Sequence, residues 1–436
     1  MSTIDYSDPN NTPPLGEAIP LGLQHVLAMF ASNVTPSIIV AGAAGLAFGG
    51  AEQIYLIQMA MLFAGIATLF QTVGIGPVGA KLPIMQGTSF AFVGVLAGVA
   101  ATQGLSVALT ACIIAGLIHF ALGGVIQKLR FMFPPLVTGL VILAIGLYLI
   151  PVAIKYAAGG AADFQMAADS FGSLMHWTVA LTVVVVSLVC KFMAKGLISN
   201  AAVLIGLIAG YIVAIFFGMV SFGSVANSAW ILIPAAMPYG FEFSLGAVIG
   251  VTLVSFVSAI ETIGDTSATT KAGSGRDASN EEITGATYAD GLGTAVAGVF
   301  GGLPNTSFSQ NVGIVGMTGI MSRHVVTIAG IIMIICGLIP KIGAVISSMP
   351  LPVLGGGVIV MFGMVAAAGM NMLSTINMNR RNMIIISVSL AVGLGLNLVP
   401  SAVQYLPGIW KTLATSAVAP TALLAVILNL ALPEKD

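Results

Sequence analysis

Charge is the scarcest feature of this sequence. Only 7% of its 436 residues are Asp, Glu, Lys or Arg, 58% are hydrophobic, and the mean hydropathy is +1.06. No soluble globular domain has this composition, and long apolar runs of this kind form membrane spans. The formal net charge of −1 also argues against a nucleic-acid partner, which would require a strongly basic surface.

Cysteine is rare as well. Cys112, Cys190 and Cys336 each lie in an apolar run, and their spacing fits neither a metal site nor a disulfide framework. We expect them to pack as small hydrophobic side chains, and we expect no metal and no cofactor. Residues 1–17 lack the basic region and cleavage site of a signal peptide, so we expect a cytoplasmic N-terminal tail.

The apolar runs predict an all-α polytopic membrane protein with about fourteen segments, since a helical span needs about 20 apolar residues. The third and tenth segments are short and begin with polar, proline-containing sequence. The candidate spans are residues 18–41, 53–74, 84–101, 104–125, 134–154, 174–193, 198–218, 243–263, 284–300, 306–320, 324–345, 352–370, 382–400 and 413–432.

The distribution of basic residues supports this assignment of spans. With both termini in the cytoplasm, the outside segments hold only Lys155, Lys341 and Lys411. The cytoplasmic segments hold the others: Lys81, Lys128, Arg130, Lys191, Lys195, Lys271, Arg276, Arg323, Arg380, Arg381 and Lys435. This is the positive-inside asymmetry of a protein in the cell (inner) membrane, and it favours an even number of spans.

The two halves of the chain resemble each other. The sequence PLVTGLVI at 135–142 is echoed by PVLGGGVI at 352–359, and Leu-Pro followed by Thr-Ser-Phe occurs at 82–90 and again at 303–308. Both offsets are about 220 residues, which is half the chain. Because each half would hold an odd number of spans, the copies would have opposite orientations, as in the inverted repeats of many transporters.

Residues 301–313 read as an irregular polar turn at membrane depth. Such backbone survives in a bilayer only where it lines a protected cavity, and broken spans of this kind hold the cargo of secondary transporters. Gln310 and Asn311 lie here, and Gln86 and Ser89 lie at the corresponding place in the third span. Their amides match the alternating N–H and C=O edge of a nucleobase better than an ion, although hydrogen bonds between helices are the alternative.

Three carboxylates fall inside apolar spans. Glu261 and Asp265 are four residues apart and share a helix face, and Asp290 lies in the next span. A charge at the bilayer centre costs at least about 2.5–3.5 kcal/mol, so such groups are functional by default, with a structural polar network as the alternative. Two like charges on one buried face suit a group that takes up and releases a proton. For His25, early in the first span, we expect either a direct role or a packing or orienting role.

These residues match a known family. The sequence QNVGIVGMTG at 310–319 resembles the signature of the nucleobase–ascorbate transporter family, and Gln-His at 24–25 resembles its first-span motif. ETIGDT at 261–266 resembles the eighth-span motif of the xanthine and uric acid permeases, and ADG at 289–291 resembles the ninth-span motif. The resemblance covers nearly the whole chain in the correct order.

The resemblance implies a fold of two inverted seven-span repeats, with short antiparallel strands in segments 3 and 10. Core domains would be residues 18–127 and 241–348, and gate domains would be residues 128–240 and 349–436, the gate mediating a homodimer. It implies a secondary transporter, not an enzyme, that imports a purine by proton symport with alternating access. Purine-binding candidates are Glu261, Gln310, Gln86, Ser89, Phe90, Ser307, Asn311 and His25, and coupling candidates are Asp290, Asp265 and Glu261.

Within the family, Gln310 followed by Asn311, together with Asp265, favours the purine branch over uracil permeases, which typically have Glu-Asn and a histidine at these places. Ser89 replaces the asparagine frequent in xanthine-selective members, so uric acid is as plausible as xanthine. A uracil or broader nucleobase permease remains the alternative. A sulfate-type anion transporter would share the fold but would lack a carboxylate at Glu261, because two anions repel.

Overall fold

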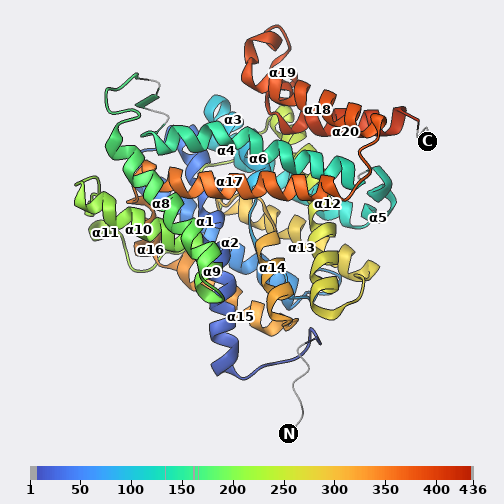
Figure 1. Ribbon diagram of the computed structural model, residues 1–436, viewed down its shortest axis with the longest axis horizontal. Helices are drawn as coiled ribbons and strands as arrows, with labels where there is room; N and C mark the ends of the chain where they lie inside the picture. The colour runs from blue at the N-terminus through green and yellow to red at the C-terminus, as the bar shows by residue number, and fades with distance from the viewer. Residues whose placement is uncertain (1–6, 133, 161–162, 165, 434–436) are drawn as a thin grey trace.

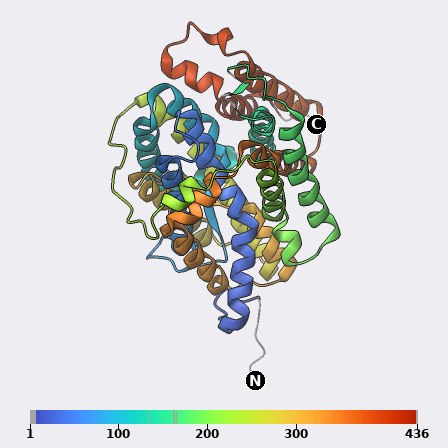
Figure 2. The ribbon, with the colours of Figure 1, turned by 90° about the vertical axis from the view of Figure 1, so that its left-hand side faces the viewer.

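The computed structural model describes residues 7–132, 134–160, 163–164 and 166–433. It is a bundle of helices with one pair of very short strands (Figures 1 and 2). The elements of the first half are α1 Leu15–Ala43, α2 Ala51–Thr72, β1 Gln86–Thr88, η1 Phe90–Phe92, α3 Val93–Gln103, α4 Leu105–Gly123, α5 Ile126–Leu129, η2 Arg130–Met132, α6 Pro135–Ala157, α8 Leu174–Met193, α9 Leu197–Asn200, α10 Ala202–Phe216 and α11 Gly223–Asn227.

The second half has the same sequence of long helices around a broken segment. Its elements are α12 Leu245–Ser274, α13 Asn280–Val299, β2 Asn305–Ser307, α14 Ser309–Thr318, α15 Arg323–Leu338, α16 Pro340–Ser347, α17 Leu351–Ser374, α18 Arg380–Leu398, η3 Pro400–Val403, α19 Gly408–Thr415 and α20 Val418–Ala431. These bounds follow the spans expected from the sequence to within a few residues at most ends.

Eight helices of the described residues are long and apolar enough to cross a membrane, and the bent pair α15–α16, with an angle of 79°, can supply a ninth. The remaining expected spans correspond to the shorter apolar helices α3, α10 and α20, to the polar helix α13, and to α14. The chain is therefore a multi-pass membrane protein of helical fold. The expected total of fourteen stays a prediction.

Antiparallel helix pairs with close backbone contact form the middle of the bundle. In Figure 1, α6 and α17 run side by side across the molecule. A Cβ atom added at Gly146 would lie 2.7 Å from the Cα of Ala366, and one added at Gly369 would lie 2.7 Å from the Cα of Leu143. Small residues allow this close approach. The resulting van der Waals contacts stabilise the association of helices in a bilayer, where the hydrophobic effect does not drive it.

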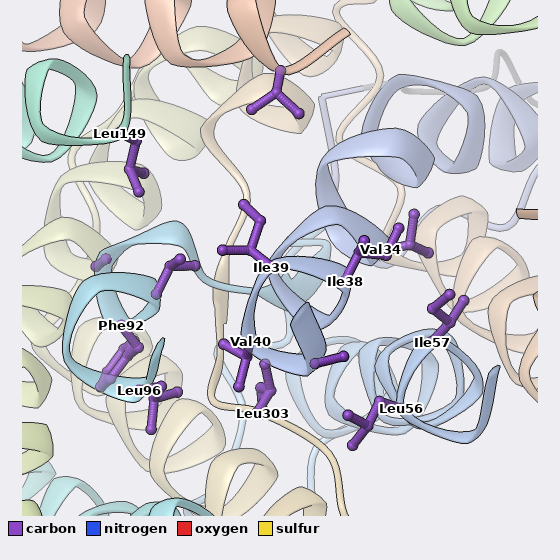
Figure 3. Packing of buried hydrophobic residues seen from close by; sticks show 14 of the residues in the cluster. Val34, Ile38, Ile39, Val40, Leu56, Ile57, Phe92, Leu96, Leu149 and Leu303 are labelled. Atoms are coloured by element: carbon purple, nitrogen blue, oxygen red, sulfur yellow. The ribbon is translucent and has the colours of Figure 1, made fainter. Parts of the chain in front are cut away.

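The same close packing joins α4 to α13 and α2 to α15. The largest hydrophobic cluster has members on α1, α2, α3, α4, α6, α12, α15 and α17 and reaches the segment before β2. Its members include Val40 of α1, Leu56 of α2, Leu96 of α3 and Leu303 (Figure 3). This packing fixes the position of the two broken segments, which contain the polar residues.

Candidate functional site

The third and tenth segments are each interrupted by a strand of three residues. The strands pair antiparallel, with Gln86 opposite Ser307 and Thr88 opposite Asn305. Hydrogen bonds flank the pair, from Ser89 N to the carbonyl of Pro304 and from Phe308 N to the carbonyl of Met85, both at 3.0 Å. Non-helical backbone at membrane depth thus satisfies its polar groups internally, as it must in the absence of water.

A half-helix begins directly after each strand. Ser89 caps the first, because its Oγ accepts a hydrogen bond from Ala91 N at 3.3 Å. The second, α14, begins at Ser309 without a side-chain cap. The partial positive charge of both helix starts therefore lies beside the same space, which Ala91 and Ser309 both line.

That space is a cavity of about 270 Å³. One wall comes from the broken segments and α12, and the facing wall is apolar and comes from α6 and α17. The lining residues are Thr88, Ser89, Phe90, Ala91, Glu261, Thr306, Ser307, Phe308, Ser309 and Gln310 on the first wall, and Ile142, Ile145, Met364, Val365 and Ala368 on the second.

Glu261 and Gln310 are the two long polar side chains of the cavity lining. Both are partly exposed, and among the residues that the structure describes neither has a hydrogen-bond partner. A free carboxylate offers two acceptor oxygens and a free amide offers both a donor and an acceptor. The pair is therefore available to bind a ligand that has N–H and C=O groups on its edge.

Asp265 lies one helical turn after Glu261 and has a different environment. Its carboxylate accepts hydrogen bonds from Ser307 Oγ at 2.6 Å and from Ser309 Oγ at 2.8 Å. Because the side chain is buried and does not line the cavity, these bonds fasten α12 to β2 and to the start of α14. Asp265 thereby holds the wall from which Ser307 and Gln310 face the cavity.

Asp290 of α13 is fully buried and joins three elements. Its Oδ1 accepts hydrogen bonds from Gln71 Nε2 of α2 at 3.1 Å and from Gln86 Nε2 of β1 at 2.5 Å. Its Oδ2 accepts a hydrogen bond from Thr262 Oγ1 of α12. Asp290 therefore lies behind the cavity, at the point where α2, β1 and α12 meet.

Asn311 and His25 also lie behind the cavity. The amide nitrogen of Asn311 donates to His25 Nδ1 at 3.0 Å and to the carbonyl of His25 at 3.1 Å. Both side chains are buried, and neither lines the cavity. The contact ties α14 to α1, in agreement with the orienting role that the sequence left open for His25.

The predicted site residues thus divide into two groups. Ser89, Phe90, Glu261, Ser307 and Gln310 line the cavity, whereas Gln86, Asn311, His25, Asp265 and Asp290 form hydrogen bonds behind it. The structure adds residues that the sequence did not single out as site residues: Gln71, Thr262, Ser309 and Asn33, whose Oδ1 accepts from Thr88 N at 2.8 Å. Gln71 and Asn33 are amides inside apolar spans, and a polar side chain in such a run is a feature by which the sequence could have identified them.

No group of three His, Cys, Asp or Glu side chains able to hold a metal ion occurs within the described residues. The polar groups around the cavity are amides, hydroxyls and carboxylates. This set of donors and acceptors is suited to a neutral, hydrogen-bonding ligand of small size.

Comparison with solved structures shows the fold class. The transmembrane domain of BicA, a cyanobacterium bicarbonate transporter, superimposes with a TM-score of 0.62, covering 96% of this chain and 98% of that domain. The sequence identity of 15% is too low to carry function.

Sequence comparison shows the family. The sequence model of the permease family matches residues 16–402. The uric acid permease PucK of Bacillus subtilis is 38% identical over 411 residues, covering 94% of each chain. The xanthine permease of the same organism is 34% identical over 420 residues, covering 95% of this chain and 93% of that protein. The chain therefore belongs to this permease family, the nucleobase–ascorbate transporter family, whose members are transporters and not enzymes.

Proposed function

We propose that this protein imports a purine nucleobase, xanthine or uric acid or both, by proton symport. The observation that carries the proposal is the pair of unpartnered side chains, Glu261 and Gln310, on the lining of a small cavity between two half-helix starts. The names of the relatives, a uric acid permease and a xanthine permease, support the purine class.

The cavity suits a flat heterocycle. Its volume of about 270 Å³ is just below the range of about 300–1,000 Å³ that is usual for sites of drug-sized ligands. In the proposed pose, Glu261 accepts ring N–H groups and Gln310 pairs with an N–H and C=O edge. The apolar wall from α6 and α17, with Ile145 and Val365, covers a face of the ring. Such a division between polar edge contacts and apolar face contacts is typical of small-molecule sites.

Alternating access follows from two bodies that move against each other. Residues 18–127 and 241–348 form the proposed core, and residues 128–240 and 349–436 form the proposed gate, so that the cavity lies between them. Core and gate also touch beside the cavity, where Phe90 meets Phe362 edge-to-face at 5.2 Å and Ser32 Oγ donates to Met361 Sδ at 3.1 Å. These two contacts beside the cavity would separate when it opens to the other side, whereas other hydrogen bonds, such as that from Ser224 Oγ to the carbonyl of Gly49, also join core and gate.

The pattern of helix packing supports two inverted seven-segment repeats. In such a repeat, α1 corresponds to α12, α2 to α13 and α4 to α15. The packing of α4 on α13 then has its counterpart in the packing of α15 on α2. The packing of α12 on α4 likewise has its counterpart in that of α1 on α15. In this arrangement both termini are cytoplasmic, the protein lies in the cell (inner) membrane, and the gate forms a homodimer.

The proposed coupling groups are Asp290, Asp265 and Glu261. They are three carboxylates close together at membrane depth, with Glu261 at the cavity and the other two behind it. Carriage of a proton by one of them would lower the cost of moving buried charge during closure.

Uptake into proteoliposomes tests the proposal. Labelled xanthine should accumulate when an inward proton gradient is imposed, and unlabelled uric acid or xanthine should compete better than guanine, hypoxanthine or uracil. A protonophore should abolish accumulation. Uptake that follows a sodium gradient and ignores the proton gradient would exclude proton symport, and uracil as the strongest competitor would exclude the purine assignment.

A further inference from the structure

One face of the strand pair carries three buried oxygen atoms that have no hydrogen-bond partner among the residues that the structure describes. They are Gln86 Oε1, Thr88 Oγ1 and Asn305 Oδ1, and the three residues are at most 1% exposed. A buried polar atom without a partner costs about 1–3 kcal/mol. Such atoms in native structures call for a physical explanation, of which ordered water is the commonest.

The strand geometry brings the three oxygens together. Gln86 and Thr88 are two residues apart on β1 and therefore point to the same face of the pair. Asn305 lies directly opposite Thr88, and directly opposed residues have Cβ atoms about 4.5–5.5 Å apart on a shared face. Two amide oxygens and one hydroxyl supply the two to four polar partners that a buried water needs.

This polar face connects the cavity with Asp290. Thr88 lines the cavity at one end, and Gln86 Nε2 donates to Asp290 Oδ1 at the other. Asp290 accepts three hydrogen bonds, and a carboxylate has about four acceptor sites, so one remains for a water molecule. Asp290 itself is fully buried and is not among the residues that line the cavity.

We propose that ordered water on this face, bound by Thr88, Asn305 and Gln86, forms the path by which protons pass between the cavity and Asp290. The inference rests on the proposed proton symport. In one direction, a hydronium at the cavity gives a proton to the first water, and each water passes one on to the next. The last water gives its extra proton to the free site of the Asp290 carboxylate, so that one O–H bond breaks on the water as another forms on the carboxylate. Release reverses these steps, so that no bond other than O–H is made or broken.

Other titratable groups face Asp290 from the elements packed around it. Glu261 and Asp265 lie on α12, and both are carboxyl groups within electrostatic reach of the Asp290 network. His119 of α4 is buried, and its backbone packs against Gly291, the residue after Asp290. The strands β1 and β2 contribute no titratable side chain. The path therefore ends among carboxylates, and Thr88 can be altered without changing any charge.

The test compares Thr88→Val, which removes the hydroxyl at nearly constant volume, with Thr88→Ser, which keeps it. Two rates are measured in proteoliposomes for each variant: uptake driven by a proton gradient, and exchange of labelled for unlabelled xanthine without a gradient. Exchange does not require net proton transfer. We expect the ratio of driven uptake to exchange to fall about tenfold in Thr88→Val and to stay near the wild-type value in Thr88→Ser.

Thr269→Val is the matched control, because Thr269 is equally buried and its hydroxyl also lacks a partner within the described part of the chain, but it lies on α12 and belongs to neither strand. It should leave the ratio unchanged. A wild-type ratio in Thr88→Val, an equal loss in Thr88→Ser, or an equal loss in Thr269→Val would overturn the water path. Wild-type protein whose uptake ignores the proton gradient would instead overturn the proposed symport.

A structure at a resolution that shows water gives a second, independent check. Water oxygens should lie within hydrogen-bond distance of Thr88 Oγ1 and Asn305 Oδ1. A dry face between these two atoms would refute the inference even if transport were altered.

Discussion

Replacing Glu261 by glutamine removes the charge of a carboxylate that lines the cavity and keeps the shape of the side chain. In the proposed complex, the carboxylate accepts hydrogen bonds from ring N–H groups. A hydrogen bond to a charged group is worth about 1.5–3 kcal/mol, and 1.4 kcal/mol corresponds to a factor of ten in affinity. Loss of one such bond in Glu261→Gln should therefore weaken purine binding by about 10- to 150-fold.

The structure also predicts what this substitution should leave unchanged. Glu261 has no hydrogen-bond partner among the described residues. The thermal unfolding midpoint of the Glu261→Gln variant in detergent should therefore stay close to that of the wild type. Asp290→Ala provides the contrast, because Gln86 Nε2 loses the acceptor that lies 2.5 Å away in a fully buried place. An unsatisfied buried donor costs about 1–3 kcal/mol, so the unfolding midpoint of that variant should fall.

Binding is measured with labelled xanthine and labelled uric acid on purified protein, and unfolding is followed on the same preparations without ligand. Unchanged affinity in Glu261→Gln for both purines would refute the role of the carboxylate. A lowered unfolding midpoint in Glu261→Gln, equal to that of Asp290→Ala, would show that Glu261 supports the fold and that its effect on binding is indirect.

Three further predictions concern the cavity and the helix packing. Gln310→Glu replaces an amide donor by a second acceptor and should lower purine affinity about tenfold or more; normal uptake by this variant would count against the amide contact. Ser89→Asn keeps a residue able to cap the half-helix but narrows the cavity, so the efficiency of uric acid transport should fall relative to that of xanthine by a factor equivalent to about 1–3 kcal/mol. Equal effects on the two purines would make Ser89 a packing residue. Gly116→Ala would place a Cβ atom 2.5 Å from the backbone nitrogen of Ala295 and should lower the unfolding midpoint, whereas Gly363→Ala meets nothing within 4 Å and should raise it slightly; the opposite order would contradict the close packing of α4 on α13.

Composition and periodicity predicted the helices well because a bilayer allows few alternatives for apolar sequence. The broken segments could be located from Pro83 and Pro304 and from the polar residues that follow them. The sequence did not reveal which polar residues reach the cavity. Glu261 and Asp265 share a helix face, yet Glu261 lines the cavity, whereas Asp265 accepts hydrogen bonds from Ser307 and Ser309, partners that the sequence did not indicate.

Gln86 shows the same limit. Its place at the start of the third span indicated a ligand contact, but its amide donates to Asp290, 204 positions further along the chain. Hydrogen bonds between residues so far apart depend on how the two halves pack, and no local pattern encodes that. Gln71 differs in part, because an amide inside an apolar span is itself a local signal; its partners Ala286 and Asp290 lie in the other half, and only their identity could not be read from the sequence.

The pairing of β1 with β2 has a consequence for how the protein is made. The first strand leaves the ribosome more than two hundred residues before the second, which spans Asn305–Ser307. Until then the backbone of Gln86–Thr88 has no partner strand, and bare N–H and C=O groups are costly in lipid. The third segment should therefore stay out of the hydrocarbon, beside the insertion machinery or in a water-filled space, and settle only after the tenth has been synthesised. A nascent chain that stops before Asn305 should accordingly leave residues 86–88 open to water-soluble labels, and extension past Ser307 should close them off.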